Sequence, residues 1–422
     1  MSQATRILLS LLAGLALGIA TTAAWPERAL DFVDVAQPIG TAWLNALRMT
    51  IVPLVVALLV TGIAATAEAA RASRLATRAI VLFLVLLWIS AAIGALLTPL
   101  FLDLWPLPEQ AAAALRATFA GAEPAGEIPP FSEFLSAIIP TNPIAAAAND
   151  AFLPLILFTT VFAFAVTRLP AEPRETLVRF FRALADVMLV MIHWVLWLAP
   201  IGVLALSYVV GARAGTSALG ALAHYVIVVA AVGGVLWLLA YPLAMFGGRV
   251  PLGRFAREVG PSQAVAISTQ SSLASLPAML AGAERLGVPV ATSGVTLPLA
   301  VAIFRVTGPC MNIAVAIYVA HVFGMELGPQ QLAAGIAAAA ITTLGAVSLP
   351  GAISFVSSIA PIAIAMGVPV EPLALLVAVE TLPDIMRTVA NVTMDVSTTT
   401  VISARSGDVP ERTEADALLD AE

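Results

Sequence analysis

Apolar stretches long enough to cross a lipid bilayer follow one another along almost the whole chain. A membrane-spanning helix needs about 20 mainly apolar residues, because all of its backbone N–H and C=O groups must be bonded within the segment. Such stretches cover approximately residues 5–25, 39–66, 77–102, 131–167, 180–210 and 217–246. Only 11% of the residues are charged, against about 25% in soluble domains. The sequence therefore predicts an all-α polytopic membrane protein.

The last part of the chain is also apolar, but Gly, Pro, Ser and Thr interrupt it at residues 259–287, 291–323, 329–367 and 371–404. Broken backbone is tolerated at membrane depth only where protein or a water-filled cavity satisfies its amides. We interpret Ser268–Pro277 and Thr342–Gly351 as the tips of two re-entrant hairpins, each followed by one long helix. Such an internal repeat is typical of secondary transporters. For each tip, a kinked ordinary span with back-bonded hydroxyls is the alternative.

The last stretch carries charged and amide side chains on one face. In a helix, Asp384, Arg387, Thr388, Asn391 and Asp395 lie at positions i, i+3, i+4, i+7 and i+11. A charged residue within the membrane costs roughly 2.5 to 3.5 kcal/mol, so it is rare there without a partner, a cavity or a ligand. The stripe predicts a polar compartment inside the membrane. A self-neutralising pair of Asp384 and Arg387 is the alternative.

Residue counts exclude several classes of function. The chain has no lysine, which excludes a Walker A loop, and its single cysteine, Cys310, excludes an internal disulfide. No basic patch with interleaved aromatic residues indicates binding of nucleic acid. His193, His224 and His321 lack the spacing of metal ligands and are interpreted as core or interface residues. We therefore expect neither a metal centre nor a nucleic-acid partner.

Arginine is unevenly distributed among the connections between the apolar stretches. It clusters at residues 71–78, 168–182 and 249–257, whereas the loop at 106–130 is poor in arginine. Positive charge favours the cytoplasmic side of a membrane, which predicts that the N-terminus and the C-terminus are both cytoplasmic. The acidic end of the chain, residues 406–422, is expected to be a disordered tail.

Several motifs resemble those of one transporter family. The chain is similar to the dicarboxylate/amino acid:cation symporter family, which includes the excitatory amino acid transporters, over about residues 5–406. The motifs that carry the resemblance are Ile139–Pro143 with Ala148, Asn149, Leu153 and Pro154, Ala199–Val203, Ser271-Ser272 with Leu276-Pro277, Gly345 with Leu349–Gly351, and the polar stripe from Asp384 to Asp395.

The resemblance implies a homotrimer in the cell (inner or plasma) membrane that works as an elevator. Each chain would have eight transmembrane helices and two re-entrant hairpins, arranged as inverted repeats. Scaffold helices would lie at residues 1–75 and 131–212. Transport-domain helices would lie at 76–105 and 213–248, and the transport-domain core at 249–405. The external loop would span 106–130 and the tail 406–422.

The resemblance also implies roles for single residues. Asp384 would hold the amino group of the cargo, Arg387 its side-chain carboxylate, and Asn391 with the tip Ser271-Ser272 its α-carboxylate. The second hairpin would act as the gate. The chemistry agrees, because a guanidinium donates two parallel hydrogen bonds to a carboxylate and an aspartate can receive an ammonium. We therefore expect secondary transport of a small anionic solute, with an acidic amino acid such as aspartate or glutamate as the favoured cargo.

Three more residues complete the implied substrate site: Gly308, Ala346 and Thr388. Gly308 stands where the family often has a hydroxyl, which keeps a C4-dicarboxylate or a neutral amino acid open as the cargo. A membrane-embedded hydrolase using Ser271 or Ser272 is a remote alternative, because it would need a nearby His or Lys base. No enzyme and no cofactor are expected.

The chain departs from the family at positions that bind sodium. The usual Asn-Met-Asp-Gly-Thr of the seventh span aligns with residues 304–308, so that Phe304 replaces the amide and Val306 the aspartate. Ala302 replaces a threonine. In the third span, Phe83, Leu86 and Leu87 replace a tyrosine and a Thr-Ser pair. Hard cations need oxygen ligands, so sodium remains possible but its main sites are expected to be degraded.

Two charged residues are candidates for the coupling role. Arg305 replaces the methionine of the motif, and as a fixed cation it could do part of the work of sodium by pairing with Asp395. The alternatives are that Arg305 snorkels to an edge, or that the alignment shifts at the Gly308-Pro309 break. Glu380, one turn before Asp384, is either a proton carrier or an external rim charge.

Overall fold

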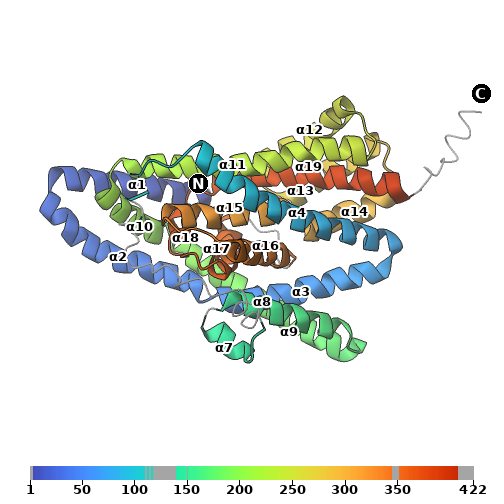
Figure 1. Ribbon diagram of the computed structural model, residues 1–422, viewed down its shortest axis with the longest axis horizontal. Helices are drawn as coiled ribbons and strands as arrows, with labels where there is room; N and C mark the ends of the chain where they lie inside the picture. The colour runs from blue at the N-terminus through green and yellow to red at the C-terminus, as the bar shows by residue number, and fades with distance from the viewer. Residues whose placement is uncertain are drawn as a thin grey trace, which may run out of the picture.

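Every regular element of the described chain is helical. The computed structural model describes residues 3–109, 112–113, 116, 139–149, 151–344 and 351–406, and within these ranges it contains no β-strand (Figure 1). Among these residues, the helical segments long and apolar enough to cross a membrane are Thr5–Ala24, Pro26–Ala70, Arg74–Leu104, Ala171–Trp197, Leu219–Gly247 and Val290–Val322. The all-α fold predicted from the apolar pattern is confirmed.

The first part of the chain is also helical in its described residues. Its helices are α1 (Gln3–Ala24), α2 (Pro26–Arg48), α3 (Ile51–Ala72), α4 (Arg74–Leu104), α7 (Pro143–Ala148), α8 (Phe152–Thr167), α9 (Ala171–Trp197), α10 (Ala199–Ala214) and α11 (Ser217–Pro242), which a π-helical turn extends at Leu243–Gly247. Most of the loop expected at 106–130 and of the tail expected at 406–422 lies outside the described residues.

Three of the expected spans have wrong boundaries. The span at 131–167 is not one helix, because residues 139–142 are not helical, α7 ends at Ala148 and α8 begins at Phe152. The span at 39–66 belongs to a longer helical segment, since α2 begins at Pro26 and α3 follows it after a short break at Met49 and Thr50. The span at 180–210 is two helices, because α9 ends at Trp197 and Pro200 occupies the first turn of α10. Proline has no N–H with which to continue the hydrogen-bond ladder of the preceding helix.

The outer helices keep large apolar side chains on their surfaces. Examples from five different helices are Leu12, Trp88, Phe164, Trp194 and Ile227, all of which are exposed in the single chain. In water such surfaces would favour association, whereas in a bilayer they contact lipid tails. This surface agrees with a multi-pass membrane protein.

Two pairs of helices turn back on themselves in the last part of the chain. α12 (Leu252–Thr269) and α13 (Ser272–Arg285) form the first pair, and Gln270 adopts the left-handed conformation at their turn, with φ 51°. α16 (Pro329–Thr343) and α17 (Gly351–Ala365) form the second pair, whose turn at 345–350 lies outside the described residues. Both pairs lie where the sequence predicted hairpins.

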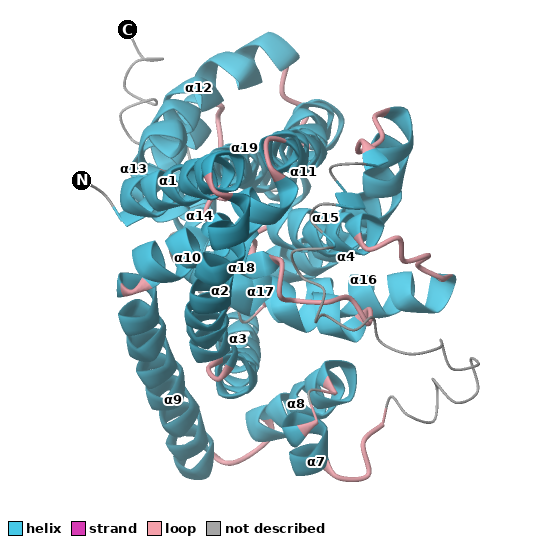
Figure 2. Ribbon diagram, turned by 90° about the vertical axis from the view of Figure 1, so that its left-hand side faces the viewer, coloured by secondary structure: helices cyan, strands magenta, loops and turns pink. Residues whose placement is uncertain are grey.

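The helix expected at 291–323 is broken in its middle. α14 (Val290–Ile303) ends and α15 (Thr307–Val322) begins around residues 304–306, earlier than the break expected at Gly308-Pro309. Nearly all of α15 is buried, and it contacts α4, α11, α16, α17 and the last helix, α19 (Thr381–Ser406) (Figure 2). A short helix, α18 (Leu373–Leu376), precedes α19. The break therefore lies in the interior of the fold.

Small residues allow α1 and α10 to approach each other closely. Gly14 and Gly18 are four residues apart on α1, and Ser207 and Gly211 are four residues apart on α10. A Cβ added to Gly18 would collide with the backbone of Tyr208, and one added to Gly211 with the backbone of α1. This is the small-xxx-small packing of membrane helices, in which close backbone contact replaces the hydrophobic effect.

We expect Gly211→Leu to destabilise the protein, because the new side chain must push α1 and α10 apart. Overpacking of this kind costs about 1 to 3 kcal/mol and lowers the midpoint of thermal unfolding in detergent. Gly234→Leu on α11 is the matched control, since no atom lies within 4 Å of a Cβ added there. Equal midpoints for the two variants would contradict the close packing of α1 on α10.

Candidate functional site

Charged and amide side chains lie along α19 and at the residue just before it. Glu380, Asp384, Arg387, Asn391 and Asp395 are all less than one-tenth exposed. Pro383 is tolerated in this helix because it lies in the first turn, where its missing N–H has no partner to lose. The helical stripe predicted from the spacing is therefore confirmed, and its side chains are buried rather than on a solvated face.

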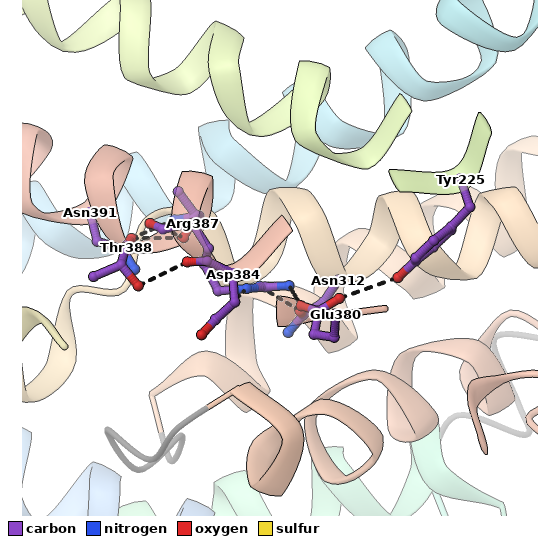
Figure 3. Close-up of polar contacts among 8 residues, drawn as sticks. Tyr225, Asn312, Glu380, Asp384, Arg387, Thr388 and Asn391 are labelled. Carbon is purple, nitrogen blue, oxygen red and sulfur yellow. Dashed lines mark hydrogen bonds and ion pairs between the residues drawn. The ribbon is translucent and has the colours of Figure 1, made fainter. Parts of the chain in front are cut away.

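The guanidinium of Arg387 is the centre of this polar group (Figure 3). Its Nη2 donates a hydrogen bond of 2.8 Å to Oε1 of Glu380, and its Nη1 donates one of 2.9 Å to Oδ1 of Asn312 on α15. Its Nε lies 3.6 Å from Oδ1 of Asp384. The pair of Asp384 and Arg387 thus exists, but it shares the guanidinium with two other groups. Buried charges with several partners avoid the cost of an unpaired charge.

Glu380 is bonded from two sides. Its Oε1 receives the hydrogen bond from Arg387, and its Oε2 accepts one of 3.3 Å from the hydroxyl of Tyr225 on α11. The ring of Tyr225 packs edge-on against Tyr318 of α15, with 5.2 Å between the ring centroids. Glu380 is only 2% exposed. It is therefore not the external rim charge that the sequence left open.

Asn391 bonds the start of α15. Its Oδ1 accepts hydrogen bonds of 2.9 Å from both the backbone N–H and the hydroxyl of Thr307, the first residue of that helix. The same hydroxyl lies 3.2 Å from the backbone oxygen of Arg387. The first N–H groups of a helix have no partner within the helix, so a side-chain acceptor is needed when they are buried. Asn391 supplies that acceptor at the break between α14 and α15.

A small cavity of about 30 Å³ lies among these groups, enough for about one or two water molecules. It is bordered by α15, the break before it, both helices of the second pair, and α19 with Glu380. Its lining residues are Arg305, Gly308, Asn312, Thr342, Thr343, Phe355, Ser358, Glu380, Arg387 and Asn391. Most of its lining side chains are polar or charged, so the space lies within the polar group.

The structure brings five of the predicted site residues to one cavity. Arg305, Gly308, Glu380, Arg387 and Asn391 all line it. These residues come from the break before α15, the first turn of α15, and the region of α19, which are separated by many residues in the sequence. The cavity contains two cationic side chains and one carboxylate. It is therefore a site suited to an anionic group.

The remaining predicted substrate residues lie apart from the described lining of the cavity. Asp384 is buried behind it and touches Arg387, and Thr388 donates its hydroxyl back to the backbone oxygen of Asp384 at 2.9 Å. Ser271 and Ser272 lie at the turn between α12 and α13 and are half-buried. Ala346 lies outside the described residues. Their roles in binding stay predictions.

Asp395 is the least satisfied charged group of the stripe. It is 1% exposed, and neither of its carboxylate oxygens has a hydrogen-bond partner among the described residues. The direct pair with Arg305 expected from the sequence is therefore not formed. Arg305 instead lines the cavity together with Arg387. Its charge acts on Asp395 only from a distance.

Several residues of the site were not identified from the sequence. They are Tyr225, Thr307, Asn312, Phe355 and Ser358. A lone amide in the very apolar α15 is a signal that could have marked Asn312, because a buried amide needs partners. Nothing in the sequence around Tyr225, on a different helix, distinguishes it from a core aromatic residue.

The positions that align with sodium ligands of the family carry apolar side chains. Phe83 of α4 and Phe304 at the break stack face to face, with 4.4 Å between centroids and 12° between planes. Leu87 and Val306 belong to the same apolar cluster. Such side chains offer no oxygen to a hard cation. Among the described residues, no three His, Cys, Asp or Glu side chains are grouped so that they could hold a metal ion.

Comparison with known proteins identifies related transporters. The sequence matches the sodium:dicarboxylate symporter family over residues 4–405. It is 28% identical to the proton/glutamate-aspartate symporter of Escherichia coli (strain K12), over 93% of this chain and 90% of that protein. It is also 28% identical to C4-dicarboxylate transport protein 2 of Ralstonia nicotianae, over 98% of this chain and 91% of that protein. Neutral amino acid transporter B(0) of Oryctolagus cuniculus is 28% identical, over 92% and 77%.

We expect Arg387→Met to destabilise the protein strongly, because it leaves the buried Glu380 without its cationic partner. Breaking a buried ion pair from one side costs roughly 3 to 5 kcal/mol, which thermal unfolding in detergent can measure. The double variant Arg387→Met with Glu380→Gln should recover most of the loss. If the double variant were less stable than Arg387→Met, Glu380 would not be the main partner of the guanidinium.

Proposed function

The chain belongs to the sodium:dicarboxylate symporter family, and we propose that its cargo is an acidic amino acid such as aspartate or glutamate. As a member of this family it is a secondary transporter in the cell membrane and not an enzyme. The resemblance found in its motifs is thereby confirmed. The names of its relatives cover acidic amino acids, C4-dicarboxylates and neutral amino acids, so the choice among these cargoes depends on the site.

The observation that carries the proposal is the buried Arg387 with a carboxylate on each side. Its Nη2 bonds Glu380 at 2.8 Å, and its Nε lies 3.6 Å from Asp384. A cargo with a carboxylate for Arg387 and an ammonium for Asp384 matches both signs of charge. A plain dicarboxylate would place a second negative group near Asp384. A neutral amino acid has only its α-carboxylate, so with that group bound at Asn391 the guanidinium would have no anionic cargo group.

The proposed roles follow the polarity of each group. Arg387 binds the side-chain carboxylate of the cargo through its planar fork of donors. Asp384 receives the ammonium. Asn391 and the turn at Ser271-Ser272 bind the α-carboxylate, for which the amide of Asn391 and the serine hydroxyls are donors. The second helix pair, α16 and α17, acts as the gate for the cargo in this proposal, supported by the presence of residues from both of its helices in the lining of the cavity.

Transport by an elevator motion within a homotrimer is part of the proposal. The first helices, α1 to α3 and α7 to α10, form the scaffold, and α4, α11 and α12 to α19 form the moving domain. Support comes from the distribution of polar groups, because the cavity and its partners belong to α11 and to elements after α14. Both chain termini lie on the cytoplasmic side in this proposal, which the arginine-rich connections support.

Sodium is not a required co-substrate in this proposal. Support comes from the stacked rings of Phe83 and Phe304, which occupy positions where oxygen ligands would be needed. Arg305 provides a built-in positive charge at the same break, and it lines the cavity beside Arg387. A fixed cation in this place attracts the carboxylates of the cargo without a bound metal ion.

We expect Arg387→Gln to abolish uptake of labelled aspartate and glutamate into proteoliposomes, because the amide carries no charge for the side-chain carboxylate. Arg48→Gln is the matched control, since Arg48 pairs with Glu371 at 2.6 Å away from the cavity. Uptake by the control should stay near the wild-type level. Equal uptake of acidic cargo by Arg387→Gln and the wild type would show that the cargo is assigned wrongly.

We expect aspartate uptake to continue when choline replaces sodium on both sides of the membrane. We also expect Arg305→Met to weaken aspartate binding by roughly tenfold, the effect of losing one favourable charge interaction of about 1.4 kcal/mol. Uptake assays and isothermal titration measure these two effects. Strict dependence on sodium, or unchanged affinity of Arg305→Met, would refute the role of Arg305 as the fixed cation.

A further inference from the structure

A second cavity lies between α3, α8 and α9, apart from the cavity at Arg387, and we call it the α9 cavity. Its volume is about 500 Å³, within the range of about 300 to 1,000 Å³ that small-molecule sites occupy. α3 contacts both of the other helices, and its border of the cavity is mostly alanine, whose small side chain leaves the space open (Figure 1). The two cavities share no lining residue. The α9 cavity is therefore a separate site.

Charged side chains of both signs line the α9 cavity. Arg174, Glu175, Arg179 and Arg182 belong to the N-terminal part of α9, and Glu68 belongs to α3. Within the described residues, none of these five side chains forms an ion pair or a side-chain hydrogen bond. Their donors and acceptors are therefore available to a ligand in the cavity.

The α9 cavity lies at the level where the apolar spans end. α8 ends at Thr167, which lines the cavity, and α3 ends one turn after Glu68, at Ala72. α9 is charged in its first turns, but after Asp186 it contains no Asp, Glu, Lys or Arg up to its end at Trp197. Such a change from charged to apolar marks the boundary between water and the hydrocarbon of the bilayer. The cavity is therefore at the depth of the lipid head groups.

An apolar face of α9 continues from the cavity into the hydrocarbon region. Val190 lies eleven residues after Arg179, which is three helical turns along the same face, and Trp194 lies one turn beyond Val190. Both apolar side chains are exposed. Acyl chains attached to a head group in the cavity can pack on this face, which a small soluble ligand would leave uncovered.

We propose that the α9 cavity binds the head group of a phosphatidylethanolamine from the surrounding bilayer. Basic pockets between membrane helices suit phospholipid head groups, because the fork of a guanidinium donates parallel hydrogen bonds to phosphate oxygens. Glu175 and Arg179 are four residues apart on α9, and such positions have Cβ atoms about 5–6 Å apart. They therefore reach the ammonium and the phosphate of one ethanolamine group, which only two carbons separate. The proposal does not depend on the identity of the cargo.

The two glutamates decide which head group fits. The cavity has three arginines and two glutamates, so its formal charge is only one positive unit. A purely anionic head group, such as that of phosphatidylglycerol or cardiolipin, would bring phosphate near two carboxylates and offer no cation to them. The quaternary ammonium of phosphatidylcholine has no N–H to donate. A primary ammonium has three donors, and it balances the carboxylates while the phosphate balances the arginines.

Lipid binding to the purified, delipidated protein in detergent tests the proposal. Native mass spectrometry counts bound phosphatidylethanolamine, phosphatidylglycerol and phosphatidylcholine that have the same acyl chains. We expect the wild type to bind phosphatidylethanolamine most tightly. Arg179→Gln with Arg182→Gln should weaken that binding by about tenfold or more, because charge-assisted hydrogen bonds to the phosphate are lost. Arg74→Gln with Arg78→Gln is the matched control, since these exposed arginines of α4 do not line the cavity.

Two further variants separate recognition of the head group from general attraction by charge. Glu68→Gln with Glu175→Gln should remove the preference for phosphatidylethanolamine over phosphatidylglycerol, because no carboxylate remains for the ammonium. Ala65→Trp keeps every charge but fills the cavity, and it should weaken binding as much as the double arginine variant. Because Ala65 is exposed, the larger side chain enters the cavity without disturbing the core.

Unchanged binding of phosphatidylethanolamine by the double arginine variant, or by Ala65→Trp, would overturn the proposal. Tighter binding of phosphatidylglycerol or phosphatidylcholine by the wild type would overturn the choice of head group. Glycerophosphoethanolamine carries the same head group without acyl chains. We expect its affinity to be much weaker, because the apolar face of α9 then contributes nothing. An affinity equal to that of the lipid would identify a soluble ligand and would overturn a lipid site.

Discussion

The burial of one guanidinium within an apolar, membrane-embedded fold is the constraint on which the rest of this structure depends. Arg387 is 8% exposed, and an ionised group at that depth persists only if other groups neutralise and bond it. Glu380, Asp384 and Asn312 do so from two directions, which ties α19 to α15. Tyr225 extends the network to α11. The polar groups thus position three helices that are far apart in sequence.

In this fold a polar side chain forms the hydrogen bond that a break in a buried helix leaves open. The break between α14 and α15 leaves N–H groups that lipid could not satisfy, and Asn391 accepts from the first of them. Because α15 begins in the interior, its first turn brings Gly308 and the neighbouring Arg305 to the cavity. An unbroken helix would have carried Arg305 on a continuous apolar surface, where its charge would have no partner. The break is therefore part of the site and not a defect of the helix.

The same break also contains apolar side chains at positions that align with sodium ligands of the family. Phe304 turns away from the cavity to stack on Phe83, whereas Arg305, the next residue, lines the cavity. Adjacent residues in an irregular segment can point in opposite directions. The same short stretch therefore adds an aromatic ring to the apolar packing and a cationic side chain to the cavity.

The sequence alone determined the class of fold and the identity of the polar helix. Long apolar stretches require helices in a membrane, and the spacing from Asp384 to Asp395 requires one shared face, because both follow from local backbone geometry. Only the tertiary structure decided which group pairs with Arg387, where α14 and α15 separate, and that Tyr225 and Asn312 belong to the site. It also separated Arg305 from Asp395, which the sequence had paired. These outcomes depend on how helices that are distant in sequence pack together. The local sequence pattern does not determine that packing.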